Sequence, residues 1–334
     1  MKPLVTLLLP TLNRTTYLRE AVDSVLAQDY PNLDILISDN GSSNETPEFV
    51  RSIVNGDPRV RFRRNELTVP IYDHFNQLVQ EVRGEYFLVV CDDDVITPTF
   101  VSEVVGVATR HRDINVVVSV NVTMDQRGNV LREYGQPESE VVDGVDFVSH
   151  WLYERSPSYF ACLATMLLKT ETVHYFGGYP RFARGQSIDN MLFLQCALSG
   201  PVGFAHRAVF KWRVYDESFG TTATPEHLAQ AGRETIAFVR NEPRTVKALA
   251  ALPAAKRTEI EYGVRLLSAK AFLYNLGFYR DPPACFKKVF IYPFDTVFLG
   301  IVLRHYVWWV RNLIGRRDGS KDAAPPSPAA LPRE

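Results

Sequence analysis

The stretch GEYFLVVCDDDVITP, residues 84–98, decides the fold. Its apolar run from Tyr86 to Cys91 is typical of a strand buried on both faces of a sheet. Three carboxylates, Asp92, Asp93 and Asp94, follow at once. Carboxylates this close repel one another unless a cation or hydrogen bonds compensate, and a divalent ion is the natural compensator. The alternative is a turn whose acidic residues favour the start of the next helix.

Outward from this strand, apolar strands alternate with amphipathic helices. Upstream, residues 4–9 and 34–38 are predicted strands, each followed by turn residues and a helix, and residues 60–62 form a shorter strand. Pro10 is expected to end the first strand. Downstream, Thr97-Pro98 predicts a helix start and residues 116–122 the next strand. This alternation specifies an α/β fold with a mostly parallel central sheet and helices on both faces.

The second half of the chain has a looser pattern. Residues 123–141 form a polar stretch, which we interpret together with the following elements up to residue 168 as an insertion, and residues 225–279 are predicted helical. The remaining predicted elements are a helix over 147–153, a strand-like run over 159–168, a helix over 187–198 and a strand over 208–215. We therefore expect a main α/β domain over 1–215, a helical C-terminal region over 216–288, an amphipathic helix over 289–317 and a disordered Ala/Pro-rich tail over 318–334.

Composition excludes several classes of protein. A chain of 334 residues with 46% hydrophobic residues can fill a large core, and its net charge of -1 lacks the positive charge expected of a dedicated nucleic-acid binder. The four cysteines each lie in an apolar run, which predicts buried free thiols. The N-terminus enters a strand at once without the pattern of a signal peptide, so we expect a cytoplasmic location.

Three strand ends carry polar residues that can converge, because ligands bind outside the carboxyl ends of parallel strands. After the first strand, Thr11, Asn13 and Arg14 can direct backbone amides and a guanidinium at phosphates. After the second, Asp39 can accept a hydrogen bond from the imide N–H of uracil or thymine. The acidic triplet is the third. Each of the first two could equally be an ordinary turn.

Together these segments resemble a known family. Residues 5–46, VTLLLPTLNRTTYLREAVDSVLAQDYPNLDILISDNGSSNET, and residues 84–98 resemble the family 2 glycosyltransferases, which have the GT-A fold. The resemblance is good from residue 4 to about 105, patchy to about 215 and absent afterwards. It implies a metal-dependent inverting glycosyltransferase of the bacterial polysaccharide or O-antigen type, with a UDP- or dTDP-sugar donor and Mg²⁺ or Mn²⁺ as cofactor. Residues 1–215 would then be the nucleotide-sugar-binding and catalytic domain.

The family pattern assigns roles to residues near the strand ends. It places Asp39 on the nucleobase, Asp92 near the ribose and Asp93 on the metal, with Asp94 as a supporting ligand. Asn76, in DHFNQLV, occupies a position that is often polar and donor-binding in the family.

Two residues depart from this pattern. Cys91 stands where the metal motif usually has its first aspartate, so that Asp92 and Asp94 could serve instead of Asp93. Asn40 replaces a second aspartate and leaves base recognition to Asp39.

The catalytic base of the family is an aspartate beyond a Gly-Gly-aromatic sequence. Gly177-Gly178-Tyr179, followed by Ser187-Ile188-Asp189-Asn190, resembles this arrangement, with Ile188 where a glutamate is common. The resemblance makes Asp189 the general base; the alternative is a carboxylate that only stabilises the helix dipole. In Trp212-Arg213-Val214-Tyr215, Arg213 falls near a phosphate-contacting position, and Tyr215 replaces a frequent histidine.

The predicted helix over 289–317 is apolar around most of its circumference, but Arg304 and Arg311 argue against a membrane-spanning helix. Trp308-Trp309 and the following arginines suit a helix in the membrane interface, as in a peripheral membrane protein. The alternative is packing on the domain or on a second subunit of a homodimer. An interfacial helix would favour a lipid-linked glycan as acceptor, at the cytoplasmic face of the membrane.

Two other functions remain open at this point. A sugar-phosphate nucleotidyltransferase also uses metal-binding aspartates, but its Gly-rich basic loop is missing from residues 10–14. A catalytically inactive nucleotide-sugar-binding or scaffold protein is the non-enzyme alternative, suggested by Cys91 and Ile188.

Overall fold

The computed structural model describes residues 2–54, 56–135, 137–153, 165–215, 222–276, 278, 285, 289, 292 and 296–316. The predicted tail over 318–334 lies outside these residues. The chain divides into two compact units, one of Met1–Trp151 with Ser156–Tyr215 and one of Leu152–Arg155 with Asp216–Glu334. Each unit is described by itself.

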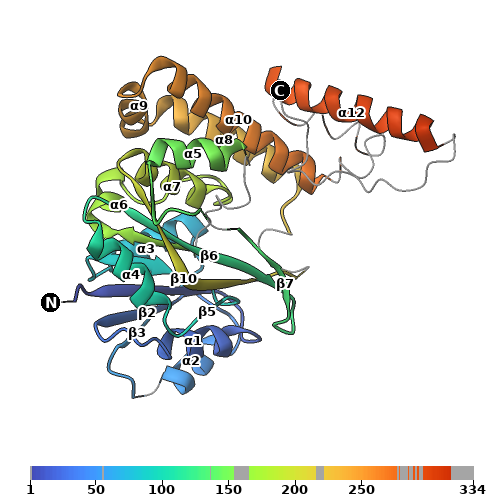
Figure 1. The fold of residues 1–334 in the computed structure, drawn as a ribbon. Helices are drawn as coiled ribbons and strands as arrows, with labels where there is room; N and C mark the ends of the chain where they lie inside the picture. The colour runs from blue at the N-terminus through green and yellow to red at the C-terminus, as the bar shows by residue number, and fades with distance from the viewer. Residues whose placement is uncertain are drawn as a thin grey trace. The chain divides into compact units, whose positions relative to one another are not determined.

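The first unit is built on a ten-stranded sheet in the order β3-β2-β1-β4-β9-β6-β10-β5, with β7 paired to β6 and β8 to β10 (Figure 1). Its strands are β1 Val5–Thr11, β2 Leu33–Asp39, β3 Val60–Arg64, β4 Tyr86–Val89, β5 Val95–Ile96, β6 Val116–Met124, β7 Val130–Glu133, β8 Val141–Val142, β9 Met166–Lys169 and β10 Val202–Arg213. Its helices are α1 Leu18–Leu26, α2 Thr46–Val54, α3 Ile71–Gln80, α4 Phe100–Arg110, α5 Gly144–Tyr153, α6 Thr170–Phe176 and α7 Ile188–Leu198.

The predicted α/β class with a mostly parallel central sheet is confirmed. Strands β3, β2, β1 and β4 run parallel, as do β6 and β10. Alternate side chains of β1, from Val5 to Leu9, pack against α1 and α4 in one fully buried core. On the other face, Phe193 of α7 contacts the rings of Phe147 and Trp151 on α5. Figure 1 shows α1 and α2 below the sheet and α6 and α7 above it.

The first strand does not end at Pro10 as predicted. It continues to Thr11, which pairs with Asp39 at the end of β2. Pairing with β4 on the other side stops at Leu8 and Val89, so the missing amide hydrogen of Pro10 costs no bond there. The two strand ends are therefore held level at one edge of the sheet.

Thr97-Pro98 does not start the helix. A short strand, β5, lies between the acidic triplet and α4, and α4 begins only at Phe100. Thr97 instead pairs with β10, since its amide donates to the Val209 carbonyl at 3.1 Å. The antiparallel pairing of β5 with β10 overrides the local helix signal.

The polar stretch over 123–141 contains two strands that the sequence did not predict. β7 pairs antiparallel with β6, and β8 pairs antiparallel with β10. The strand-like run over 159–168 is described only from residue 165, where β9 inserts antiparallel between β4 and β6. The conformation of these strands depends on pairing with other strands rather than on a local alternation of apolar and polar residues.

The second unit is helical. Its helices are α8 Pro225–Asn241, α9 Pro243–Ala250, α10 Ala254–Asn275 and α12 Thr296–Arg316. Thr224 and His227 form a capping box at the start of α8, and Glu242 lies between α8 and α9, which begins at Pro243. Phe272 and Phe298 lie in a buried cluster that joins α10 to α12. No helix within the described part of the chain is long and apolar enough to cross a membrane.

Candidate functional site

Two predicted strand ends meet directly at the carboxyl edge of the sheet. Thr11 donates a 2.7 Å hydrogen bond from its hydroxyl to Asp92, and its carbonyl accepts one of 2.9 Å from the Asn40 amide. Thr11 thus links the turn after β2 to the turn after β4. The predicted convergence arises from the parallel pairing of β1 with both neighbours.

Asp92 is buried beneath this edge. Its side chain also lies 3.5 Å from the Arg14 guanidinium. Burial, with the nearby charge of Asp93, raises the pKa of Asp92 to about 6, although Arg14 and Thr11 oppose the rise. Burial and Asp93 likewise hold the pKa of Asp94 well above its usual range. Burial and the neighbouring carboxylate therefore disfavour the charged forms of Asp92 and Asp94, and a bound cation would offset that cost.

Asp93 is held by a cation and a phenol. The Arg14 guanidinium donates to its Oδ2 at 2.5 Å, and the Tyr215 hydroxyl donates to the same oxygen at 2.6 Å. Arg14 also lies over the Tyr215 ring, 5.7 Å from its centroid. From the sequence, Tyr215 was identified only as a replacement for a frequent histidine. In the structure, Tyr215 contacts the predicted metal ligand Asp93 directly.

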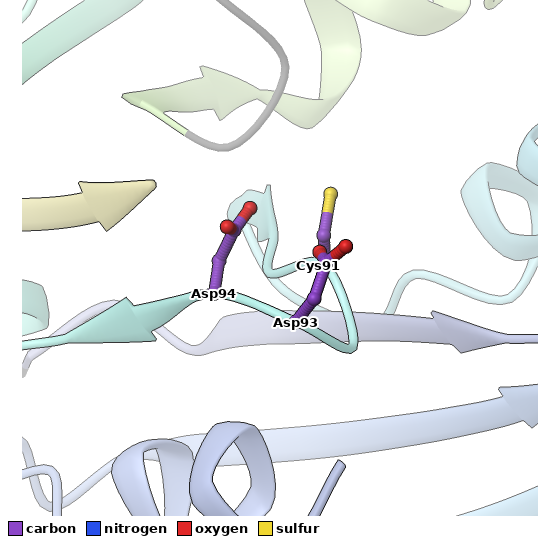
Figure 2. A group of neighbouring side chains, drawn as sticks. All are labelled: Cys91, Asp93 and Asp94. Carbon is purple, nitrogen blue, oxygen red and sulfur yellow. The ribbon is translucent and has the colours of Figure 1, made fainter. Parts of the chain in front are cut away.

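A group of metal-binding side chains occupies the same turn. One ligand atom from each of Cys91, Asp93 and Asp94 lies within 4.8 Å of the others, and the three side chains project to the same side of the turn (Figure 2). The two predicted metal ligands are therefore neighbours, and Asp92 lies outside the group. Carboxylate oxygens suit Mg²⁺ or Mn²⁺, so this donor set fits a divalent ion.

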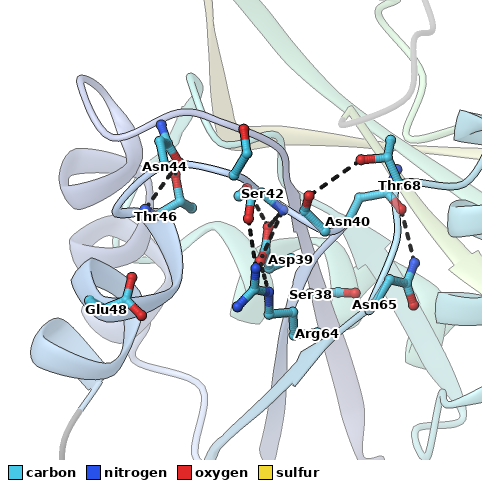
Figure 3. Close-up of polar contacts among 12 residues, drawn as sticks. Ser38, Asp39, Asn40, Ser42, Asn44, Thr46, Glu48, Arg64, Asn65 and Thr68 are labelled. Atoms are coloured by element: carbon cyan, nitrogen blue, oxygen red, sulfur yellow. Dashed lines mark hydrogen bonds and ion pairs between the residues drawn. The ribbon is translucent and has the colours of Figure 1, made fainter.

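The end of β2 forms a second polar cluster (Figure 3). Asp39 is fully buried, accepts hydrogen bonds from the amide and hydroxyl of Ser42, and pairs with Arg64 at 3.1 Å. Arg64 was missed by the sequence reasoning. The strand register could have identified it, because β3 pairs with β2 so that Arg64 lies opposite Asp39. A buried carboxylate beside an arginine offers both an acceptor and a donor to a planar polar ligand.

Asn13 connects the first two strand ends. It has a left-handed backbone with φ of 53°, which asparagine tolerates better than most residues. Its amide donates to the Ser42 hydroxyl at 2.7 Å, and its side-chain oxygen accepts from the Ser43 amide at 2.8 Å. Asn13 therefore fixes the two turns relative to each other.

Asn76 clamps the segment that precedes the predicted base. Its side-chain amide donates to the Tyr179 carbonyl at 2.9 Å and accepts from the Tyr179 amide at 2.8 Å. Gly178 has φ of +86°, and a Cβ there would lie 2.3 Å from the Asn76 oxygen. The glycine is required both by the backbone and by this close approach.

Asp189 lies in the first turn of α7 and is partly exposed. Ser187 just before it has a left-handed φ of 65°. Asp189 and Cys91 both lie within electrostatic range of Tyr179, whose burial and proximity to Asp189 hold its pKa well above the usual range. The Tyr179 hydroxyl is buried and, among the described residues, has no hydrogen-bond partner. Tyr179 is therefore within electrostatic range of both the predicted base and Cys91, the residue before the acidic triplet.

Arg213 lies beneath the acidic turn with only 1% of its side chain exposed. Its guanidinium pairs with Glu20 at 2.5 Å, lies 4.3 Å from the Tyr17 ring centroid, and donates to the Asp93 carbonyl at 3.0 Å. Its backbone amide donates to Asp94 Oδ1 at 3.0 Å. These contacts describe a residue that positions the acidic turn.

Residues 6–169 match the sequence profile of Glycosyl transferase family 2. The matched segment contains all three strand ends and stops before Asp189 and Arg213. Among curated relatives, an uncharacterised glycosyltransferase of Methanocaldococcus jannaschii is 28% identical over 139 residues, covering 41% of this chain and 48% of the relative. Glycosyltransferase GlyG of Streptococcus pneumoniae is 27% identical over 126 residues, covering 38% and 42%. The chain thus spans about half the length, or less, of these relatives.

Solved structures share the fold. S. aureus TarS 1-349 in complex with UDP-GlcNAc superposes with a TM-score of 0.63 at 16% identity, over 86% of this chain and 79% of that one. The mannosyltransferase PcManGT from Pyrobaculum calidifontis, in complex with GDP-Man and Mn²⁺, gives a TM-score of 0.54 at 13% identity, over 96% and 89%.

Replacing Arg213 with methionine should destabilise the first unit by about 2–4 kcal/mol, because it removes several buried hydrogen bonds and one side of an ion pair. Urea unfolding followed by circular dichroism measures the loss. Arg207→Met, on an exposed position of the same strand, is the matched control and should change stability by less than about 0.5 kcal/mol. Equal losses in the two variants would contradict the positioning role.

Proposed function

We propose that the protein transfers a sugar from a nucleoside-diphosphate sugar to an acceptor hydroxyl, since residues 6–169 match the Glycosyl transferase family 2 model. The observation that carries this proposal is the meeting of the three strand ends through Thr11, Asp39 and the acidic turn. Such an edge can bind a base, a ribose and a diphosphate in sequence.

The donor that fits best is a UDP- or dTDP-sugar. Asp39 accepts the imide N–H of the pyrimidine, with Arg64 beside it, and Asp92 lies near the ribose. Thr11, Asn13 and Arg14 frame the phosphate side of the site, and Asn76 shapes it from α3. The UDP-GlcNAc complex of TarS supports a uridine donor, whereas the GDP-Man complex of PcManGT shows that the same fold accepts a purine.

A divalent ion, Mg²⁺ or Mn²⁺, fits the donor set of Asp93 and Asp94. When bound, it would neutralise the charge that develops on the departing diphosphate. Arg14 already balances part of this negative charge from the other side of Asp93. Arg213 holds the backbone of the turn, so that both carboxylates keep their directions.

Asp189 acts as the general base of an inverting reaction. It removes the proton from the acceptor hydroxyl as the oxygen forms a bond to the anomeric carbon, while the bond to the diphosphate breaks on the opposite face. Its partly exposed position at the start of α7 suits a group that must meet an incoming acceptor. The helix N-terminus stabilises the carboxylate before the proton arrives.

The acceptor is a lipid-linked glycan in cell-surface polysaccharide synthesis, met at the cytoplasmic face of the membrane. Support comes from α12, on which Leu299, Leu303, Tyr306 and Val307 are exposed at helical spacing. Arg304 is also exposed on this helix and can meet anionic lipid. A homodimer through the same apolar residues is the alternative occupant.

Asp189→Asn should bind donor normally but transfer sugar about 10²–10⁴-fold more slowly, because the amide cannot take up the acceptor proton. Donor binding is measured by calorimetry and transfer by product formation with a panel of UDP-, dTDP- and GDP-sugars. The neighbouring Asn190→Ala is the control and should keep most activity. Near-normal turnover in Asp189→Asn would remove its assignment as base. Binding heat without any turnover in the wild type would favour the inactive binding protein.

Asp93→Asn should lower metal-stimulated transfer by about 10²–10³-fold, because it withdraws a charged ligand opposite the leaving diphosphate. Transfer is measured over a Mn²⁺ and Mg²⁺ titration and after treatment with EDTA. Asp23→Asn, on the α1 helix, is the control for loss of a carboxylate elsewhere. Full activity of the wild type in EDTA would refute the metal role.

Leu303→Glu combined with Val307→Glu should reduce binding to anionic lipid vesicles about tenfold or more, because two apolar side chains leave the interface and two negative charges enter it. Co-sedimentation measures the bound fraction. Tyr274→Glu, an exposed aromatic residue on α10, is the control. If vesicle binding is unchanged but a dimer dissociates in gel filtration, α12 is a subunit interface instead.

A further inference from the structure

Cys91 lies on the turn between β4 and β5, one residue before the acidic triplet. Its Sγ atom and one oxygen each of Asp93 and Asp94 lie within 4.8 Å of one another (Figure 2). A side-chain hydrogen bond already links the thiol to Asp94. Three donor atoms at this spacing can bind one ion, and one of the three is sulfur.

The hydrogen bonds around this group leave a carboxylate oxygen of Asp93 available to an ion. Among the described residues, the side-chain hydrogen bonds given to Asp93, from Arg14 and Tyr215, all go to Oδ2. The backbone amide of Arg213 takes Oδ1 of Asp94. Oδ1 of Asp93 accepts none of these bonds, so it can meet an ion that also meets the thiol and Asp94.

Tyr179 supplies an independent indication of a ligand at this place. Its side chain is 2% exposed, and its hydroxyl has no hydrogen-bond partner within the described part of the chain. Cys91 and Asp189 both lie within electrostatic range of this side chain. Buried polar groups are almost always satisfied, so an unpaired one indicates a ligand or an ordered water.

We propose that the Cys91 thiolate is the third protein ligand of this ion, beside Asp93 and Asp94. When the ion binds, the S–H bond is replaced by a bond from sulfur to the metal, and the proton leaves to solvent. A sulfur ligand favours thiophilic ions such as Co²⁺, Zn²⁺ and Cd²⁺, whereas Mg²⁺ prefers oxygen alone. The site therefore binds the first three ions more tightly than Mg²⁺, and only the ion's role in transfer rests on the proposed function.

Cadmium titration of the full-length protein without any nucleotide sugar tests the thiolate. The wild type should develop a thiolate-to-cadmium charge-transfer band in the ultraviolet that saturates at one equivalent. Cys91→Ser should lose the band and bind Cd²⁺ at least about tenfold more weakly, because a ligand of the ion is gone. Circular dichroism checks that both proteins are folded equally.

Two further variants make the outcome specific. Cys196→Ala removes a thiol that is buried in α7, and it should keep the wild-type band. Cys91→Asp should restore binding without the band and shift the preference from Cd²⁺ towards Mg²⁺ by about tenfold or more, since all its ligands are then oxygen.

A band that persists in Cys91→Ser, or that is missing from the wild type, overturns the proposal. The same holds if Cys91→Asp leaves the ratio of Cd²⁺ to Mg²⁺ affinity unchanged. Because none of these measurements uses a donor or an acceptor, a failure of sugar transfer would contradict the proposed function and leave the cadmium result to stand by itself.

Discussion

The cost of burying the neighbouring carboxylates Asp92, Asp93 and Asp94 together is the constraint on which the rest of the site depends. Two arginines from distant parts of the chain oppose it. Arg14, from the turn after β1, approaches the carboxylates of Asp92 and Asp93 directly. Arg213, at the end of β10, holds the same turn through its backbone amide and its guanidinium. Burial and the charge of Asp93 still hold the pKa of Asp94 well above its usual range, so a bound cation would stabilise the charged form of the turn.

The sequence was sufficient to predict the parallel half of the sheet. Strands β1, β2 and β4 are almost continuous apolar runs, which identify strands covered on both faces, and turn residues mark their ends. The antiparallel strands were missed because they carry little signal of their own. β5 and β8 have two residues each, and all four residues of β7 are exposed, so pairing with β10 and β6 determines their conformation.

The same limit applies to the side chains of the site. Positions that follow a strand in the sequence, such as Thr11, Asp39 and Asp93, could be named in advance because parallel register brings strand ends together. Arg64 and Tyr215 could not be named in advance. Arg64 contacts Asp39 and Tyr215 contacts Asp93, pairs that are 25 and 122 residues apart in the sequence and that only the fold brings together. Their residue types were visible, but nothing local indicated which carboxylate each would meet.

The Asn76 clamp joins the matched family segment to the chain that precedes α7, where the proposed base Asp189 lies. Asn76 belongs to α3, within residues 6–169, and its amide pairs with the backbone of Tyr179 as a neighbouring strand would. Gly178 permits this approach, because any side chain there would meet the Asn76 oxygen. The clamp sets the position of the Tyr179 ring, which is in electrostatic range of both Cys91 and Asp189. A residue predicted from the sequence to contact the donor thus holds the backbone at Tyr179, nine residues before the start of α7.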